Sequence, residues 1–338
     1  MPNGNILIIG AEQMPFEEMV ENGFDTLSNN QSSLYFETIL EINPNTDSVV
    51  WQWHSWDHLI QELDASKLNY GIVVNHPEKI HLNYQEFTAQ KPDFLHANSI
   101  DYNEELDQIL LSVRNFNEVW IIDHSASTAE AASSEGGLSG MGGDLMYRWG
   151  NPHAYQRGSL EERKLFRQHD AQWIDDLVDS TYVHFGKLAI FNNSVGDGVS
   201  LGQIFAPQWD ANTNTYLMEE DIFLPTGISD SFSHPEPDKN FSGVASSIQI
   251  FGNGYVQMCV AQQGRTFVLN PEGELVWEYI TPLRNGQAVP QGFNLNVSEN
   301  FTFQAQSYPK NYPAFIGRDL SPKGYICLLY TSPSPRDS

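Results

Sequence analysis

Two histidines stand at matching places in repeated segments of the chain. His96 opens the segment HANS, and His169 opens the segment HDAQW. A neutral imidazole is nucleophilic near pH 7, and the bond it forms is labile enough to pass a group onward. If each segment is the first strand of a repeated unit, the two rings face one cavity. The pair therefore indicates group-transfer chemistry; the alternative is that each ring caps a strand or satisfies buried backbone.

Transfer of a charged group needs hydrogen-bond donors for its outer oxygens and an acid or base at the departing oxygen. Several polar residues could supply such contacts. Gln249 stands where the last repeat should place a third channel residue, but an amide can serve neither as nucleophile nor as acid or base. The predicted substrate-binding residues are Asn98, Gln172, Asn193, Gln249 and Arg265.

Short strands in a repeated order would have to position these residues. The clearest unit spans residues 243–279 and contains four apolar segments separated by glycine-containing turns: GVASSIQIF, YVQMCVAQQ, RTFVLN and LVWEY. Four strands per repeat, with a period of about 40 to 50 residues, are typical of β-propeller blades. The innermost strand of each blade lines the central channel, which is where both histidines would lie.

Less regular copies of this unit occur elsewhere in the chain. They cover residues 5–53, 96–149 and 169–223, the last ending in a predicted strand at 215–223, and a partial copy covers 293–297 with 301–307. We therefore predict an all-β protein with a β-propeller fold, of about six blades when intact, with four to five visible here.

Aromatic pairs recur at the ends of these units, and long insertions separate them. The pairs are Trp51 and Trp53, Tyr147 and Trp149, and Trp277 and Tyr279. We expect them to pack between neighbouring blades; unrelated strands of a β-sandwich are the alternative. The polar insertions 54–92 and 124–143 are expected to form the wall of one face.

Five segments resemble the arylsulfotransferase family, in the branch found in marine bacteria: DFLHANSIDYNEELDQILLSVRNFNEVWIIDHS, GGDLMYRWGNPHAY, RQHDAQWI, KLAIFNN and YPAFIGRDLSPKGYI. The similarity covers nearly all of residues 3–326. It implies a propeller that moves a sulfuryl group from an aryl sulfate to a phenol through a transient sulfohistidine, without a metal or other cofactor. It matches His169 to the family's motif histidine, with His96 as its partner, and implies a periplasmic or secreted protein.

Both ends of the sequence suggest a fragment. Residues 1–9 resemble the middle of a hairpin, so we expect the first blades and any signal peptide to be missing. Residues 327–338 contain CLLYTSPSPRD, the residue order of a translated sequencing adapter, and are expected to be a non-native tail. The predicted propeller domain is therefore residues 1–326, and the activity of this fragment is left open.

The net charge of the chain limits which molecules it can bind. The chain of 338 residues has 43 acidic and 17 basic side chains, a net charge of −26. Such a surface repels nucleic acid and anionic membranes, and no apolar run is long enough to insert into a membrane. Small-molecule aryl sulfates and phenols are the expected partners. The oligomeric state is open.

Other functions are weaker interpretations of the same residues. A non-catalytic propeller could bind a sulfated or phenolic ligand, or a protein. A quinone-dependent dehydrogenase would need a more regular tryptophan repeat.

His54 and His58 have a spacing that could bind metal on a helix, but no third ligand is evident. Asp123 and His124 lack the nucleophile elbow of a hydrolase. Arg114 and Arg148 are expected to form salt bridges between blades.

Overall fold

Antiparallel sheets are the main regular structure of the computed structural model, which describes residues 1–28, 31–84, 92–175, 178–290 and 292–321. Sheet 1 contains β1 (Ile6–Pro15), β2 (Ser33–Asn43) and β3 (Ser48–His54). Sheet 2 contains β6 (Ala97–Asn103), β7 (Gln108–Val113), β8 (Glu118–Asp123) and β9 (Tyr147–Trp149). Sheet 3 contains β10 (His169–Trp173), β11 (Leu188–Gly196), β12 (Val199–Phe205) and β17 (Asp230–Phe232). Sheet 4 contains β18 (Ser247–Ile250), β19 (Val256–Val260), β20 (Arg265–Leu269) and β21 (Leu275–Ile280).

Smaller elements decorate these sheets. They are the helices α1 (Phe16–Glu21) and α2 (Thr128–Ala131), the parallel pair β4 (Leu59–Ile60) and β5 (Ile80–His81), and the hairpins β13 (Trp209–Asp210) with β14 (Thr215–Tyr216), β15 (Met218–Glu219) with β16 (Ile222–Phe223), and β22 (Leu283–Arg284) with β23 (Gln287–Ala288). Among the described residues, no helix is both long and apolar enough to cross a membrane.

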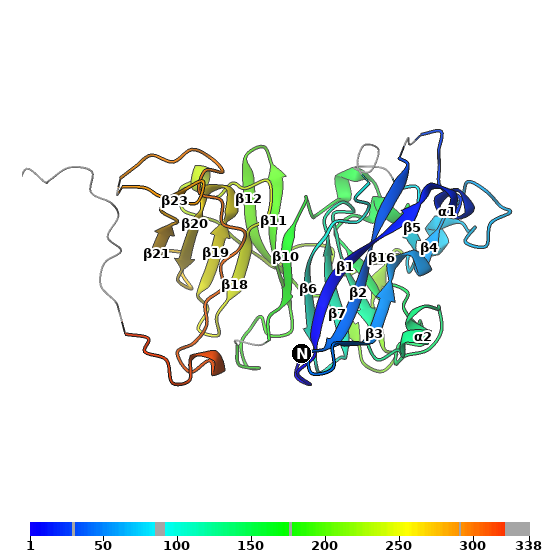
Figure 1. Cartoon of the computed structure of the whole chain (residues 1–338), viewed down its shortest axis with the longest axis horizontal. Helices are drawn as coiled ribbons and strands as arrows, with labels where there is room; N and C mark the ends of the chain where they lie inside the picture. The colour runs from blue at the N-terminus through cyan, green and yellow to red at the C-terminus, as the bar shows by residue number, and fades with distance from the viewer. Residues whose placement is uncertain (29–30, 85–91, 176–177, 291, 322–338) are drawn as a thin grey trace, which may run out of the picture.

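The four sheets follow one another along the long axis of the molecule, from sheet 1 at one end to sheet 4 at the other (Figure 1). A hydrophobic core fills each of the three spaces between successive sheets. The central strands are short and rich in β-branched and aromatic residues, and every residue of β7 and β8 is buried. This composition suits strands covered on both faces.

Polar side chains also join the first strands of neighbouring sheets. A side chain on the first strand of one sheet accepts a hydrogen bond from a backbone N–H of the first strand of the next sheet or, for sheet 4, of the segment 301–307 that runs beside it. Ser99 Oγ accepts from Ala171 (2.8 Å), Asp101 Oδ2 from Trp173 (2.7 Å), Asp170 Oδ2 from Ile248 (2.9 Å), Ser247 Oγ from Ala305 (3.1 Å) and Gln249 Oε1 from Ser307 (2.8 Å).

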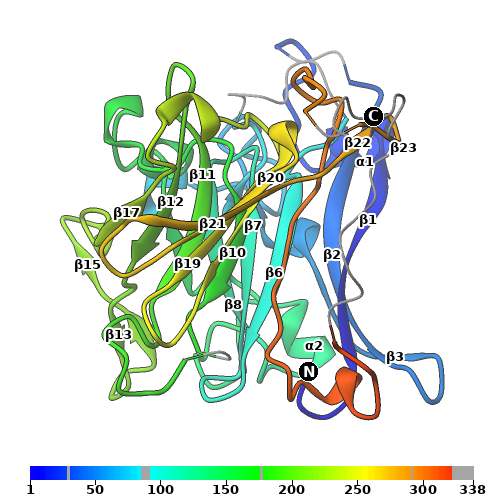
Figure 2. The same cartoon turned by 90° about the vertical axis from the view of Figure 1, so that its left-hand side faces the viewer.

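The strand predictions for the units at 5–53, 96–149 and 243–279 are confirmed, with three strands in the first and four in the others. The prediction that residues 215–223 form the last strand of the third unit is wrong. That segment instead forms parts of two short hairpins at the periphery, outside β12 and β17 (Figure 2). The rings of Tyr216 and Phe223 pack on Tyr147 of sheet 2, so their apolar pattern serves that contact.

The partial fifth unit is also corrected. Neither residues 293–297 nor residues 301–307 form a strand. Residues 301–307 instead run beside β18 and β19, where the backbone carbonyl of Ala305 accepts hydrogen bonds from Ser247 and Gln257. The predicted tail at 327–338 lies outside the described residues.

The aromatic pairs behave as predicted at two of their three places. Trp51 and Trp53 donate their indole N–H groups to the carbonyls of Ala126 and Gly143, both at 2.7 Å, in the segment that precedes the last strand of sheet 2. In the equivalent segment of sheet 3, Pro225 accepts from the indole of Trp149 (2.7 Å) and Leu224 accepts from the hydroxyl of Tyr147 (3.0 Å). Each pair therefore links one sheet to the next.

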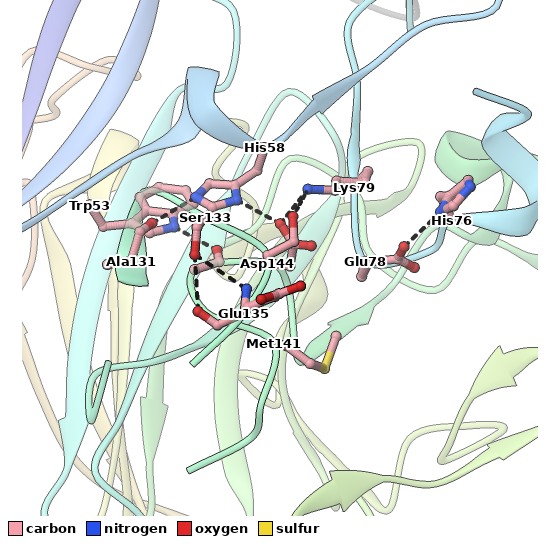
Figure 3. A network of polar contacts seen from close by, with 12 residues as sticks. Trp53, His58, His76, Glu78, Lys79, Ala131, Ser133, Glu135, Met141 and Asp144 are labelled. Carbon is pink, nitrogen blue, oxygen red and sulfur yellow. Dashed lines mark hydrogen bonds and ion pairs between the residues drawn. The ribbon is translucent and has the colours of Figure 1, made fainter. Parts of the chain in front are cut away.

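A buried polar network fixes the two insertions to each other (Figure 3). The ring of His58 stacks on Trp53, its Nδ1 lies 2.7 Å from Asp144 Oδ1, and its Nε2 lies 3.0 Å from Ala131 O. Lys79 donates to the same oxygen of Asp144 (2.6 Å). Both ring nitrogens of His58 face protein oxygens, so neither is available to a metal. Within the described ranges, no group of three or more His, Cys, Asp or Glu side chains could hold one.

We predict that Trp149→Phe lowers the free energy of unfolding by about 1 kcal/mol, because the partly buried carbonyl of Pro225 loses its donor. Urea unfolding monitored by circular dichroism measures this effect. The matched control is Trp277→Phe, since Trp277 belongs to the third aromatic pair but is half-exposed. A change of the same size in both variants would contradict the structural role of the Trp149 hydrogen bond.

Candidate active site

His169 is buried at the start of β10, and its tautomer is fixed by its neighbours. Nδ1 lies 2.8 Å from Asn193 Oδ1, which can only accept because the Asn193 amide nitrogen donates to Ser242 O and Ala245 O. The backbone N–H of Ala245 donates to Nε2 (3.1 Å). Burial, as the largest cause, lowers the pKa of His169 to about 4, with the charges of Arg114 and His96 acting in the same direction. The ring is therefore neutral, with its proton on Nδ1.

His96 immediately precedes β6 and is the more accessible of the two histidines. Its Nδ1 makes a short contact with the carboxylate of Asp93, and its side chain is 42% exposed. Nε2 has no hydrogen-bond partner in the described part of the chain. A carboxylate on one ring nitrogen and a free lone pair on the other is the arrangement that orients an imidazole for attack.

The backbone is left-handed where it leads into the first strands. The φ angles are +53° at His96, +55° at Arg167, +58° at Asp170 and +49° at Ala245. The pairing register shifts next to two of these places, between Ala97 and Ser99 and between His169 and Gln172. Such bulges change the direction in which a side chain points. His96 directly precedes the first of these shifts, and His169 lies at the second.

A group of basic side chains lies around the two histidines. The backbone N–H of Arg114 donates to the carbonyl of His96 (3.2 Å), and its guanidinium influences the charge of His169. Burial lowers the pKa of Arg114, and the nearby charge of Arg167 lowers it further. Arg114 follows β7 and Arg167 precedes β10; the two cations, offset in part by the carboxylate of Asp93, make a positive region in a chain of net charge −26. Such a region attracts an anion.

The sequence assigned Arg114 and Arg148 to salt bridges between blades, and the structure corrects both. Arg114 donates to Asn115 Oδ1 (3.0 Å), and no salt bridge of Arg114 occurs among the described residues. Arg148 pairs with Glu118 (2.6 Å), a buried neighbour in its own sheet. Arg114 is therefore a functional candidate that the sequence interpretation missed, although it lies in the same family-like segment as His96.

Four predicted donors already bind backbone carbonyls. Asn98 donates to Gln168 O (2.8 Å), Gln172 to Ile248 O (2.7 Å), Gln249 to Ser307 O (3.0 Å) and Asn193 to Ser242 O (2.8 Å). The fifth candidate, Arg265, forms an ion pair with Glu278 in sheet 4. Of this set, Asn98 keeps an unused group: its Oδ1 is buried without a hydrogen-bond partner among the described residues.

A cavity of about 610 Å³ lies between β6, β10, β18 and residues 306–313. Its lining includes Gln172, Gln249, Asp170 and the rings of Trp173 and Tyr308, but neither histidine. Asp170 Oδ2 accepts hydrogen bonds from Ile248 N and Gln172 Nε2, and burial, as the largest cause, raises the pKa of Asp170 to about 7. Near neutral pH this carboxyl can therefore give or take a proton. Its signal in the sequence is its place directly after His169.

Glu37 is a second buried acid next to the site. Its Oε1 accepts from the backbone N–H of Ala97 (2.7 Å), and its Oε2 has no partner in the described ranges. Burial, as the largest cause, and the charge of Asp93 together raise the pKa of Glu37 to about 8, against the hydrogen bond from Ala97, which lowers it. Glu37 is therefore mostly protonated at neutral pH. It places a neutral acid beside the Asp93–His96 pair.

A family model described as Arylsulfotransferase (ASST) matches residues 1–276. The chain belongs to the arylsulfotransferase family. This is the same family that the segments around His96 and His169 resemble. No curated protein matches the chain.

Two solved structures show distant similarity to this arylsulfotransferase-family chain. A streptogramin B lyase structure has 15% sequence identity and a TM-score of 0.30, and the match covers 57% of this chain and 43% of that chain. A protein of unknown function from Bacteroides caccae has 13% identity and a TM-score of 0.29, with coverage of 76% and 75%. Both likenesses are too weak to support an argument about function.

We predict that Glu37→Gln changes the pH dependence of stability. In the folded state Glu37 keeps its proton, so the contribution of this carboxyl group to the free energy of unfolding is complete below pH 4.5. That contribution is lost as the pH rises towards about 8, with a slope approaching ~1.4 kcal/mol per pH unit. Glutamine keeps the acceptor for Ala97 without this loss. Urea unfolding at several pH values should show the variant gaining stability on the parent as pH rises, while exposed Glu17→Gln does not. Parallel profiles for Glu37→Gln and the parent would refute this.

Proposed function

We propose that this chain is an aryl-sulfate sulfotransferase that passes a sulfuryl group from an aryl sulfate to a phenol through a histidine. Family membership supports the reaction class. The observation that supports the site most directly is the grouping of His96, His169 and Arg114. His96 precedes β6, His169 begins β10, and Arg114, directly after β7, donates its backbone N–H to the carbonyl of His96 and acts electrostatically on His169.

We also propose that the four sheets are blades of a β-propeller. Three considerations favour this: the sheets are antiparallel and stacked face to face, their first strands are the ones that contact one another, and polar side chains link those strands in the same way from sheet to sheet. In a propeller these strands surround the central channel. The two histidines would then face that channel.

The proposed reaction has two balanced steps. In the first, an imidazole nitrogen forms a bond to sulfur as the bond between sulfur and the aryl oxygen breaks; the electron pair leaves with the phenolate, which then takes a proton. In the second, the acceptor phenol loses its proton and its oxygen forms a bond to sulfur, which releases the imidazole. Arg114 would stabilise the negative charge on the outer sulfuryl oxygens in both steps.

The geometry favours His96 as the nitrogen that first receives the group. Its Nε2 is free, and Asp93 is the positioning residue that orients the ring. His169 was the more probable nucleophile from the family resemblance, and it can take this role only after its Nε2 leaves the amide of Ala245. In the arrangement observed, His169 is a neutral neighbour whose proton is held by Asn193.

The same contacts favour one other candidate function. The amides of Asn98, Gln172 and Gln249 are used for backbone contacts, and Nε2 of His169 is occupied. A propeller that binds a sulfated or phenolic ligand without turning it over would tolerate this arrangement. By family, we propose a periplasmic or secreted location, small-molecule aryl sulfates and phenols as partners, and no cofactor.

We predict that His96→Ala reduces phenol-dependent release from a chromogenic aryl sulfate by roughly 1,000-fold or more, the effect of removing a covalent nucleophile. His169→Ala should lose activity too, and peptide mass spectrometry after rapid quenching should find the sulfuryl group on the peptide containing His96. Exposed His153→Ala is the matched control and should keep full activity. Release that persists in both the His96 and His169 variants would exclude histidine-mediated transfer.

If the parent chain binds an aryl sulfate but shows no turnover, the binding function is favoured instead. Arg114→Gln separates the outcomes, because loss of the cation should weaken aryl-sulfate binding but not the binding of the uncharged phenol. Calorimetry measures both affinities.

A further inference from the structure

Sheet 1 holds the next sheet in a way that differs from the other sheet boundaries. Between sheets 2 and 3, and between sheets 3 and 4, the acceptors lie on a first strand. At the boundary between sheets 1 and 2 the acceptor lies on the middle strand β2, where Glu37 Oε1 accepts from the backbone N–H of Ala97 (2.7 Å). The backbone of His96 also interacts with this carboxyl group. One side chain therefore holds the backbone at the point where β6 begins.

The backbone of His96 needs such support. Its φ angle of +53° lies in the left-handed region, which a residue other than glycine keeps only where surrounding contacts enforce it. Two contacts act on the main chain here: the carbonyl of His96 accepts from Arg114 (3.2 Å), and Glu37 accepts from the N–H that follows. A third, between His96 Nδ1 and the carboxylate of Asp93, acts on the ring. The direction of the imidazole depends on the turn that these contacts hold.

Glu37 is a costly residue for a purely structural task. Its side chain is only 5% exposed, and its Oε2 has no hydrogen-bond partner among the described residues. An ionised carboxylate in this place would lose its water and would face the carboxylate of Asp93, the charge that acts on Glu37. Asp93 in turn interacts with His96 and Arg114. A leucine would avoid this cost, but it would leave the N–H of Ala97 without its acceptor.

We infer that Glu37 is a positioning residue for His96: the hydrogen bond that it accepts from Ala97 holds the left-handed turn on which the orientation of the imidazole depends. The inference rests on the proposed function only for the identity of the substrate, an aryl sulfate. The same contact gives the site a pH signature. As the pH rises through about 8, Glu37 becomes negative beside Asp93 and His96, and the added charge opposes the binding of an anion.

Three variants separate the position of Glu37 from its charge. Glu37→Gln keeps an acceptor for Ala97 but cannot ionise, and Glu37→Leu removes both the acceptor and the charge. Glu41→Gln is the matched control, because Glu41 is an equally buried acid on β2 that contacts His124 instead of His96. Circular dichroism and the unfolding midpoint show whether each variant is folded.

Calorimetry with 4-nitrophenyl sulfate, between about pH 7 and about pH 9, gives the first readout. The affinity of the parent should fall roughly tenfold as Glu37 ionises, and the affinity of Glu41→Gln should fall equally. Glu37→Gln should bind like the parent at neutral pH and keep that affinity in alkaline solution. Glu37→Leu should turn the substrate over about 100-fold more slowly at every pH, because its imidazole is misplaced, whereas Glu37→Gln should keep the rate of the parent at neutral pH.

Carbethoxylation of His96 by diethyl pyrocarbonate, located by peptide mass spectrometry, gives a readout that needs no sulfotransferase activity. The reagent reacts with an unprotonated imidazole nitrogen, and the exposed ring of His153 is the internal reference. Relative to His153, His96 should react at the parent's rate in Glu37→Gln. It should react several-fold more slowly in Glu37→Leu, because the ring is no longer held against Asp93.

A folded Glu37→Leu chain whose His96 reacts like that of the parent overturns the inference. A parent affinity that does not fall with pH, or a fall that persists in Glu37→Gln, also overturns it, since Glu37 then does not lie beside the bound anion. If the parent neither binds nor converts the aryl sulfate, the proposed function fails. The carbethoxylation rates then decide by themselves whether Glu37 positions His96.

Discussion

The first strands of successive sheets are joined by polar side chains that accept backbone N–H groups across the sheet boundary, and the rest of the structure depends on this. A strand at the inner edge of a sheet has backbone groups with no partner in its own sheet, and leaving them buried and unpaired is costly. Ser99, Asp101, Asp170, Ser247 and Gln249 meet that need. The same contacts fix the distance between the strands that hold His96 and His169.

This constraint explains why predicted substrate donors became structural residues. Asn98, Gln172 and Gln249 lie on first strands, as the repeat indicated, but their amides bind the adjacent backbone. The residues left for chemistry are those that the left-handed backbone turns out of the strand alternation: His96, His169 and Asp170 lie at or beside such positions. Backbone strain of this kind costs about 1–3 kcal/mol per residue and is typically kept where function requires it.

The sequence predicted sheets well where turns were explicit, and less well where contacts were distant. Glycine-containing turns marked all four strands of sheet 4. The three-residue strand Asp230–Phe232 is too short to show a pattern, whereas residues 215–223 alternate like a strand although their rings serve the neighbouring sheet. The histidine pair could be proposed from its repeat positions. Glu37 and Arg114 could not, because the burial of Glu37 and the charges that act on Arg114 arise only when distant segments meet.

Charge distribution connects the fold to the proposed chemistry. A chain of net charge −26 opposes the approach of an aryl sulfate everywhere except where negative charge has been removed. Around His96, burial keeps Glu37 mostly neutral, and Arg114 and Arg167 add positive charge, which the carboxylate of Asp93 offsets in part. Burial also keeps His169 neutral, so one imidazole does not repel the charge that the other would acquire. The region is thus suited to hold an anion next to His96, whose Nε2 has no hydrogen-bond partner among the described residues.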